Sequence, residues 1–131
     1  WRFTPPTQVL AALDQAISEH KQEGGVDARG RRYAGNCRIL IEGMRRLGFQ
    51  TYLSDNLQAP IIVTFHRPPH TNFEFDEFYG RLKDKGFTIY PGKLTKADSF
   101  RMGCIGHLFE DDMKAAVEAV GDVLAEMEIS L

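Results

Sequence analysis

The chain has 131 residues, of which 43% are hydrophobic and 26% are charged, and its 16 basic and 18 acidic residues give a net charge of -2. This composition supports one domain with an ordinary core and argues against a disordered chain. It lacks the basic excess of a nucleic-acid-binding domain, and no apolar run approaches the roughly 18 residues of a membrane span. Because the sequence opens on Trp1 and not on methionine, we expect an excised domain or a processed product.

Two helices are expected in the N-terminal third. Thr4 can cap the first helix, prolines are tolerated in its first turn, and Gly24-Gly25 ends it. The second helix ends in NCRILIEGMRRLG, in which Gly48 is the stop signal, while Gly30 and Gly35 leave its start open. Each helix has apolar residues at helical spacing. These residues are Val9, Leu10, Leu13 and Ile17 in the first helix, and Cys37, Leu40, Ile41 and Met44 in the second.

Strands and two more helices are expected after residue 48. The apolar and β-branched runs predict four strands at 49–53, 61–65, 87–90 and 99–105. A third helix carries Phe75, Phe78, Tyr79 and Leu82, and a last helix starts at three acidic residues, 110–112, that suit a helix N-terminus. Short links between strands favour hairpins. The expected fold is therefore a single α+β domain over residues 1–131, with an antiparallel sheet of about four strands and helices packed on one face.

One arginine interrupts the last predicted strand, DSFRMGCIG. Side chains of a strand alternate between its two faces, so Phe100 and Met102 point into the core and Arg101 points to the other face. A guanidinium stays charged and needs water or an anion, and its planar fork matches a carboxylate or phosphonate. Gly103 and Gly106 leave space beside it. Arg101 is therefore either an exposed strand arginine or a clamp for an anionic ligand.

The other candidates are weaker. Thr4 either caps the first helix or presents its hydroxyl to a phosphate at the helix N-terminus. Lys93 and Lys96 read as solvated loop lysines, because nothing near them is apolar enough to lower a lysine pKa. His66 and His107 flank strands without a catalytic partner at a suitable spacing.

The two cysteines, Cys37 and Cys104, are expected to be reduced and buried. They show no metal-ligand spacing with the histidines, so no metal site is expected.

Three segments resemble a known family: WRFTPPTQVL, EGGVDARGRRY and GFTIYPGKLTKADSFRMGCIG. They are similar to the C-terminal part of class V, fold-type I pyridoxal-phosphate aminotransferases, and in particular to a branch that uses an aminophosphonate and pyruvate. The resemblance covers essentially the whole chain. The R-x-G-x-x-G spacing that begins at Arg101 is shared across the class, whereas the last two segments are specific to that branch.

The resemblance implies a cytoplasmic homodimer with pyridoxal 5'-phosphate at the subunit interface. It implies that Arg101 binds the anionic group of the substrate. It also implies that Thr4 and Trp1 lie at the cofactor phosphate of the neighbouring subunit. The lysine that holds the cofactor belongs to a large domain outside this chain. No catalytic residue is thus expected here, and the chain alone should be inactive.

Three alternatives remain open at this stage. The chain can belong to another class V enzyme, of the alanine–glyoxylate or phosphoserine type. It can also be a stand-alone module that binds an amino acid or organic anion through Arg101. An RNA-binding sheet with exposed aromatic residues is the poorest of the three, because of the charge balance.

Overall fold

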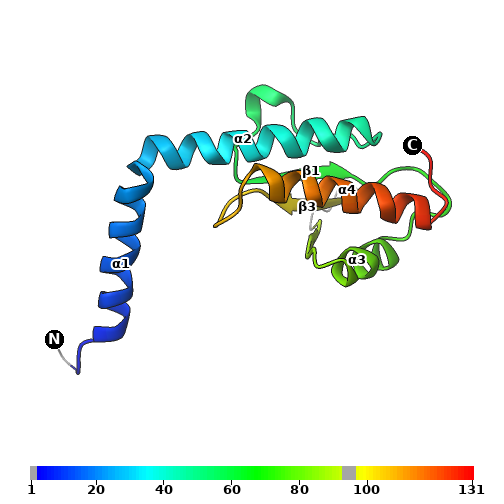
Figure 1. The fold of residues 1–131 in the computed structure, drawn as a ribbon. Helices are drawn as coiled ribbons and strands as arrows, with labels where there is room; N and C mark the ends of the chain where they lie inside the picture. The colour runs from blue at the N-terminus through cyan, green and yellow to red at the C-terminus, as the bar shows by residue number, and fades with distance from the viewer. Residues whose placement is uncertain (1–2, 93–96) are drawn as a thin grey trace. The chain divides into compact units, whose positions relative to one another are not determined.

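A computed structural model describes residues 3–92 and 97–131. That part of the chain contains four α-helices, a short 3-10 helix and a small sheet, and Figure 1 shows their arrangement as a ribbon. The chain divides into two compact units, Trp1–Arg32 and Tyr33–Leu131. In chain order the elements are α1 (Thr7–Glu23), α2 (Gly25–Arg46), η1 (Asp55–Leu57), β1 (Ile62–His66), α3 (Phe75–Asp84), β2 (Tyr90–Pro91), β3 (Ser99–Gly103) and α4 (Glu110–Glu126).

The first unit contains α1 and the beginning of α2. Gly24 ends α1 with a left-handed φ of 104°, which glycine adopts without a Cβ penalty, and its N–H is donated to the carbonyls of His20 and Lys21. Thr4 does not cap this helix, which corrects one of the two sequence interpretations of that residue. The N-cap is Pro6, and no side chain caps the first turn.

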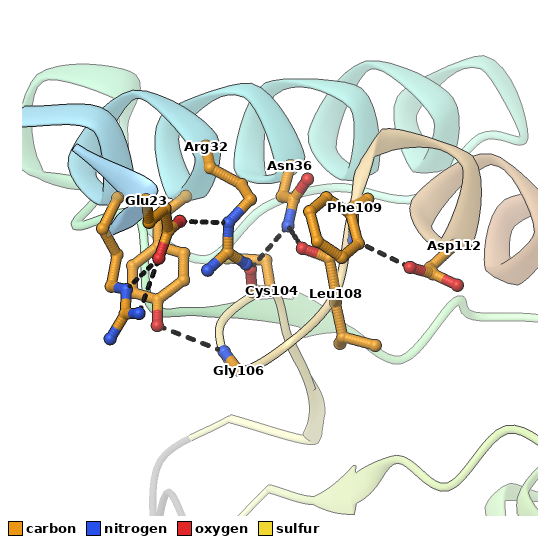
Figure 2. Close-up of polar contacts among 10 residues, drawn as sticks. Glu23, Arg32, Asn36, Cys104, Gly106, Leu108, Phe109 and Asp112 are labelled. Atoms are coloured by element: carbon orange, nitrogen blue, oxygen red, sulfur yellow. Dashed lines mark hydrogen bonds and ion pairs between the residues drawn. The ribbon is translucent and has the colours of Figure 1, made fainter. Parts of the chain in front are cut away.

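The apolar stripe of α1 is exposed. None of the residues of α1 is buried, and Val9, Leu10, Leu13 and Ile17 are between 44% and 65% exposed. An acidic residue at the end of α1 forms the main polar contact of this unit. The Glu23 carboxylate accepts hydrogen bonds from Arg29 and Arg32, each 2.7 Å long, as Figure 2 shows for Arg32.

The second unit is built on a three-stranded antiparallel sheet. The strand order is β1-β3-β2, so β3 lies in the centre. β1 pairs with β3 over five residues, from Ile62 opposite Gly103 to His66 opposite Ser99. The β2 strand pairs with β3 over two residues only, Tyr90 opposite Arg101 and Pro91 opposite Phe100.

One face of this sheet forms the core. Val63 and Phe65 of β1 lie opposite Met102 and Phe100 of β3, and all four are buried. Phe100 is the centre of an aromatic cluster, with ring centroids 5.5 to 6.4 Å from those of five neighbours: Phe49, Phe65, Phe73, Phe75 and Phe78. Buried residues of α2, α3 and α4 join the same cluster, so the α+β class with helices covering one sheet face is confirmed.

Helices α2 and α4 approach each other closely at a glycine. A Cβ added to Gly43 would lie 2.6 Å from a methyl carbon of Val117, which is closer than side-chain carbons come to one another. Gly43 is buried, and α2 continues as a regular helix through Gly30 and Gly35. The second helix therefore starts at Gly25, directly after the end of α1.

The strand count is smaller than the sequence predicted. Residues 49–53 form no named strand, and Thr51 makes one isolated bridge with Phe65. Two backbone hydrogen bonds, from Tyr52 to Thr64 and from His66 to Gln50, hold this segment beside β1 before the chain turns into η1.

The strand predicted at 87–90 is also reduced, because the end of α3 uses part of it. Gly86 has a φ of 92°, and the N–H of Phe87 is donated to Leu82 in a Schellman-type ending. Ile89 then enters the core, and the β2 ladder starts only at Tyr90.

Across residues 3–92 and 97–131, the helices are too short or too polar to cross a membrane.

Candidate anion-binding site

Arg101 lies on the sheet face opposite the aromatic core. Burial along β3 alternates around it, with Phe100 and Met102 buried and Arg101 half-buried. The register places Thr64 of β1 and Tyr90 of β2 directly opposite Arg101, one on each side. Residues paired in this way project to the same face of the sheet. The prediction that Arg101 points away from the core is therefore confirmed, and the site forms a row of three side chains across three strands.

The guanidinium group is only partly satisfied by the protein. Its Nη2 atom donates to the carbonyl oxygen of Pro91 at 3.3 Å, which is a long bond. Its Nε atom is buried and has no hydrogen-bond partner among the described residues. Arg101 forms no ion pair with a carboxylate of the described residues. A buried donor without a partner costs free energy, so the fork has unused capacity for an anion.

Gly92, which follows β2, and Ser99, which begins β3, approach each other closely. The Gly92 N–H is donated to the carbonyl of Ser99 at 2.9 Å. A Cβ at Gly92 would lie 2.2 Å from that carbonyl oxygen, so glycine is required for this approach. Ser99 shares the face of Arg101 by alternation, yet it is only 2% exposed, and a Cβ on Gly92 would also lie 2.2 Å from its hydroxyl oxygen. Lys93 and Lys96 lie outside the described residues.

Two glycines follow Arg101 and leave its surroundings open. A Cβ at Gly103, which is two residues along β3 on the same face, would meet no atom within 4 Å. Gly106 has a left-handed φ of 98° and would likewise meet nothing, so its role is to turn the chain. Its N–H is donated to the hydroxyl of Tyr33 at 3.4 Å. The space predicted beside the arginine therefore exists at Gly103.

A buried asparagine fixes the segment after β3. Asn36 of α2 is 0% exposed, and its side-chain amide donates to the carbonyls of Cys104 at 3.2 Å and Leu108 at 2.9 Å. Figure 2 shows this side chain between the two carbonyls. At the start of α4, the Asp112 carboxylate accepts the Phe109 N–H at 2.7 Å, which is a favourable helix N-terminal contact. These contacts hold both ends of the turn that contains Gly106.

The contacts of the described residues join neither His66 nor His107 to Arg101. Thr4 is exposed and belongs to the first unit, so its assignment to a phosphate stays a prediction, and Trp1 lies outside the described residues. His66 ends β1 with its ring 5.4 Å from that of Tyr52, and His107 lies 5.0 Å from the ring of Phe109.

Both cysteines are free and buried, as predicted. No group of three metal-ligating side chains occurs among residues 3–92 and 97–131.

Sequence reasoning missed Arg67, which directly follows β1. Its guanidinium carbon lies 4.8 Å from the ring centroid of Phe75, and its Nε atom is buried without a partner in the described part of the chain. Arg67 also lines a cavity of about 360 Å³ together with His66 and His70. The prolines at 68 and 69 predicted only a loop here. No sequence pattern indicated that Phe75 would lie under the Arg67 guanidinium.

Solved structures define the class to which this fold belongs. Pyridoxamine–pyruvate aminotransferase from Mesorhizobium loti matches 98% of this chain with a TM-score of 0.85, at 20% identity and over 33% of its own length. Alanine–glyoxylate aminotransferase from Nostoc sp. matches 95% with a TM-score of 0.83, also at 20% identity and over 33% of its length. The fold is thus that of one part of an aminotransferase.

Sequence comparison finds similarity to one kind of transaminase. The chain is 54% identical over 98% of its length to 2-aminoethylphosphonate–pyruvate transaminases from Pseudomonas aeruginosa and Pseudomonas putida. It spans 35% of the length of these relatives and matches their C-terminal part. No family model matches the chain. The resemblance inferred from the sequence segments is therefore confirmed.

Proposed function

We propose that this chain is the C-terminal small domain of a pyridoxal-phosphate-dependent transaminase that transfers the amino group of 2-aminoethylphosphonate to pyruvate, giving phosphonoacetaldehyde and alanine. The similarity to transaminases of that name over 98% of the chain is the observation that carries the proposal. The large cofactor-binding domain lies in the part of those relatives that this chain does not match. The working enzyme is then a cytoplasmic homodimer, and the isolated chain is inactive.

Arg101 binds the anionic group of each substrate in turn in this proposal. Its fork lies on the open sheet face, its Nε lacks a partner, and its ion-pairing capacity is unused among the described residues. A phosphonate and a carboxylate both offer at least two acceptor oxygens to a guanidinium. One rigid arginine on a central strand can therefore orient the amino donor and then the acceptor, and neither substrate needs a separate clamp.

In this proposal Thr4 contributes to the cofactor site of the neighbouring subunit. Thr4 is exposed and does not cap α1, so its hydroxyl is available to donate to the cofactor phosphate. Trp1 would line the same site. The cofactor carries the amino group between the two substrates, while this chain supplies binding and orientation through Thr4 and Arg101.

A chimeric enzyme tests this function. The matching C-terminal segment of the Pseudomonas aeruginosa relative is replaced by this chain, and alanine formation from 2-aminoethylphosphonate and pyruvate is measured. We expect turnover with this pair and far less with alanine and glyoxylate or with phosphoserine. A folded, cofactor-loaded chimera that preferred either of those other reactions would contradict the assignment.

The role of Arg101 is tested in the same chimera. Arg101→Ala should lower kcat/KM for both substrates by on the order of a thousandfold, the scale of a lost charge-paired contact. Arg101→Lys should recover only part of the activity, because the bidentate fork is lost. Arg46→Ala, which removes an exposed arginine of α2, is the matched control and should change little. Unchanged kcat/KM in Arg101→Ala would show that another group binds the anion.

A further inference from the structure

Two cysteines that are distant in sequence meet in the core of the second unit. Cys37 lies on α2 and Cys104 directly follows β3, and they are 6% and 0% exposed. Their thiols form a hydrogen bond with each other. The pair contains the only cysteines of the chain, so neither has a competing thiol within it.

The backbone around Cys104 is held toward α2. Its N–H is donated to Ile61 at 3.0 Å, and its carbonyl accepts the amide of Asn36, the residue next to Cys37, at 3.2 Å (Figure 2). Both backbone groups of Cys104 are therefore fixed by neighbours, one of which is adjacent in sequence to the partner cysteine. These contacts fix the backbone of Cys104 beside α2, next to the residue that precedes Cys37.

A cavity gives small molecules a route to one of the two thiols. Cys37 lines a cavity of about 370 Å³ together with Arg38, Ile41, Glu42 and Arg45, whereas Cys104 is absent from its lining. A water-sized oxidant such as hydrogen peroxide fits easily in this volume. Arg45 is paired with Asp55 at 2.6 Å and Arg38 with Glu42 at 3.4 Å, so the rim carries both signs of charge.

The hydrogen bond also distinguishes the two thiols chemically. The Cys104 thiol donates to the Cys37 sulfur, which lowers the pKa of Cys37, while the same bond and burial raise the pKa of Cys104. Thiolate is the nucleophilic form of cysteine. The thiol that the cavity reaches is thus the one that ionises more readily, and the enclosed thiol is its neighbour.

We propose that Cys37 and Cys104 form a peroxide-oxidisable dithiol site in which Cys37 reacts first and Cys104 resolves the product to a disulfide. The Cys37 sulfur attacks one oxygen of hydrogen peroxide, the O–O bond breaks, and Cys37 becomes a sulfenic acid with release of one water. The Cys104 sulfur then attacks the Cys37 sulfur, the S–O bond breaks, and a second water leaves. The two thiols lose two electrons in total, and these reduce the peroxide.

Intact-mass and peptide analysis of the 131-residue chain tests the site. The native chain treated with hydrogen peroxide should lose the mass of two hydrogen atoms, and a non-reducing digest should contain the peptides of Cys37 and Cys104 joined. Treatment with dithiothreitol should restore both thiols. A native chain that kept both thiols, while the same chain in urea oxidised, would overturn the proposal.

Two variants test the order of the steps. Oxidation of Cys104→Ala should stop at a sulfenic acid on Cys37, which dimedone traps. In Cys37→Ala, peroxide should oxidise the remaining Cys104 thiol at least about tenfold more slowly than it oxidises the first thiol of the wild-type chain. Equal rates in the two variants, or a dimedone adduct on Cys104 alone, would overturn the assigned order. The wild-type measurement decides the existence of the site even where a variant folds poorly.

Discussion

Asn36 offers a sharp test of how the segment after β3 is held in place. Asn36→Ala removes two hydrogen bonds, to the carbonyls of Cys104 and Leu108. An acceptor that loses its partner in a buried place costs about 1 to 3 kcal/mol. The Oδ1 atom of Asn36 is itself buried without a partner among the described residues, so its removal returns about 1 kcal/mol. The expected net loss in the free energy of unfolding is about 3 kcal/mol.

Urea unfolding followed by circular dichroism measures this loss directly. At about 4 °C per kcal/mol for a chain of this size, the Tm should also fall by roughly 12 °C. The matched control is Asn56→Ala, which removes an exposed asparagine whose Oδ1 accepts a 2.6 Å bond from Ser54. That change should stay within about 0.5 kcal/mol. If the two variants lost equal stability, the inference that the Asn36 amide fixes the turn would be refuted.

Three further predictions test other contacts of the fold. Gly43→Ala places a Cβ against Val117 and should lower the free energy of unfolding by about 1 to 3 kcal/mol in urea melts. Adding Val117→Ala to the same chain should restore part of this loss, and additive losses would contradict the close helix contact. Hydrogen bonds from Arg32 and then Arg29 lower the pKa of Glu23 from 4.5 to about 2, so its contribution to stability is complete above pH 4.5 and disappears as the pH falls toward 2. A carbon-detected NMR titration should show this low pKa, and Arg32→Gln should move it upward; a Glu23 pKa near 4.5 in the unmodified chain would disprove the pairing. Phe100→Ala should cost about 3 to 5 kcal/mol in the same melts, and a loss below about 1 kcal/mol would show that the aromatic cluster does not depend on it.

Alternation alone predicted the most important feature of the site. Burial alternates along β1 and from Phe100 to Gly103 in β3, so the placement of Arg101 opposite the core followed from Phe100 and Met102. The row that flanks the arginine could not be predicted in this way. Thr64 and Tyr90 oppose Arg101 only because of strand register, which depends on contacts between segments that are distant in sequence.

The failed predictions have local physical causes. The segment at 49–53 has strand-forming residues, but it makes only two backbone hydrogen bonds with β1. The chain then enters η1, so the ladder does not continue. The Schellman-type ending at Gly86 shortens β2, because it uses the N–H of Phe87 and directs Ile89 into the core. Local propensity indicates which residues suit a strand and does not show whether a partner is available.

The resemblance to a known family suggested a ligand for Arg101, which the chemistry of the residues alone did not. From chemistry, Arg101 was an anion clamp or an exposed arginine, and the structure leaves its fork open without identifying a ligand. The phosphonate and pyruvate in the proposal come from the name of the transaminases to which this chain is similar.

Arg101 lies between two buried neighbours in β3, so the packing of the hydrophobic core fixes the direction of its side chain. Sliding β3 by a single position against β1 would turn the guanidinium inward and expose Phe100 and Met102, so a misaligned chain would lose stability and ligand recognition together. Thr64 and Tyr90 can therefore be substituted on the outer face while the interior keeps Arg101 in position.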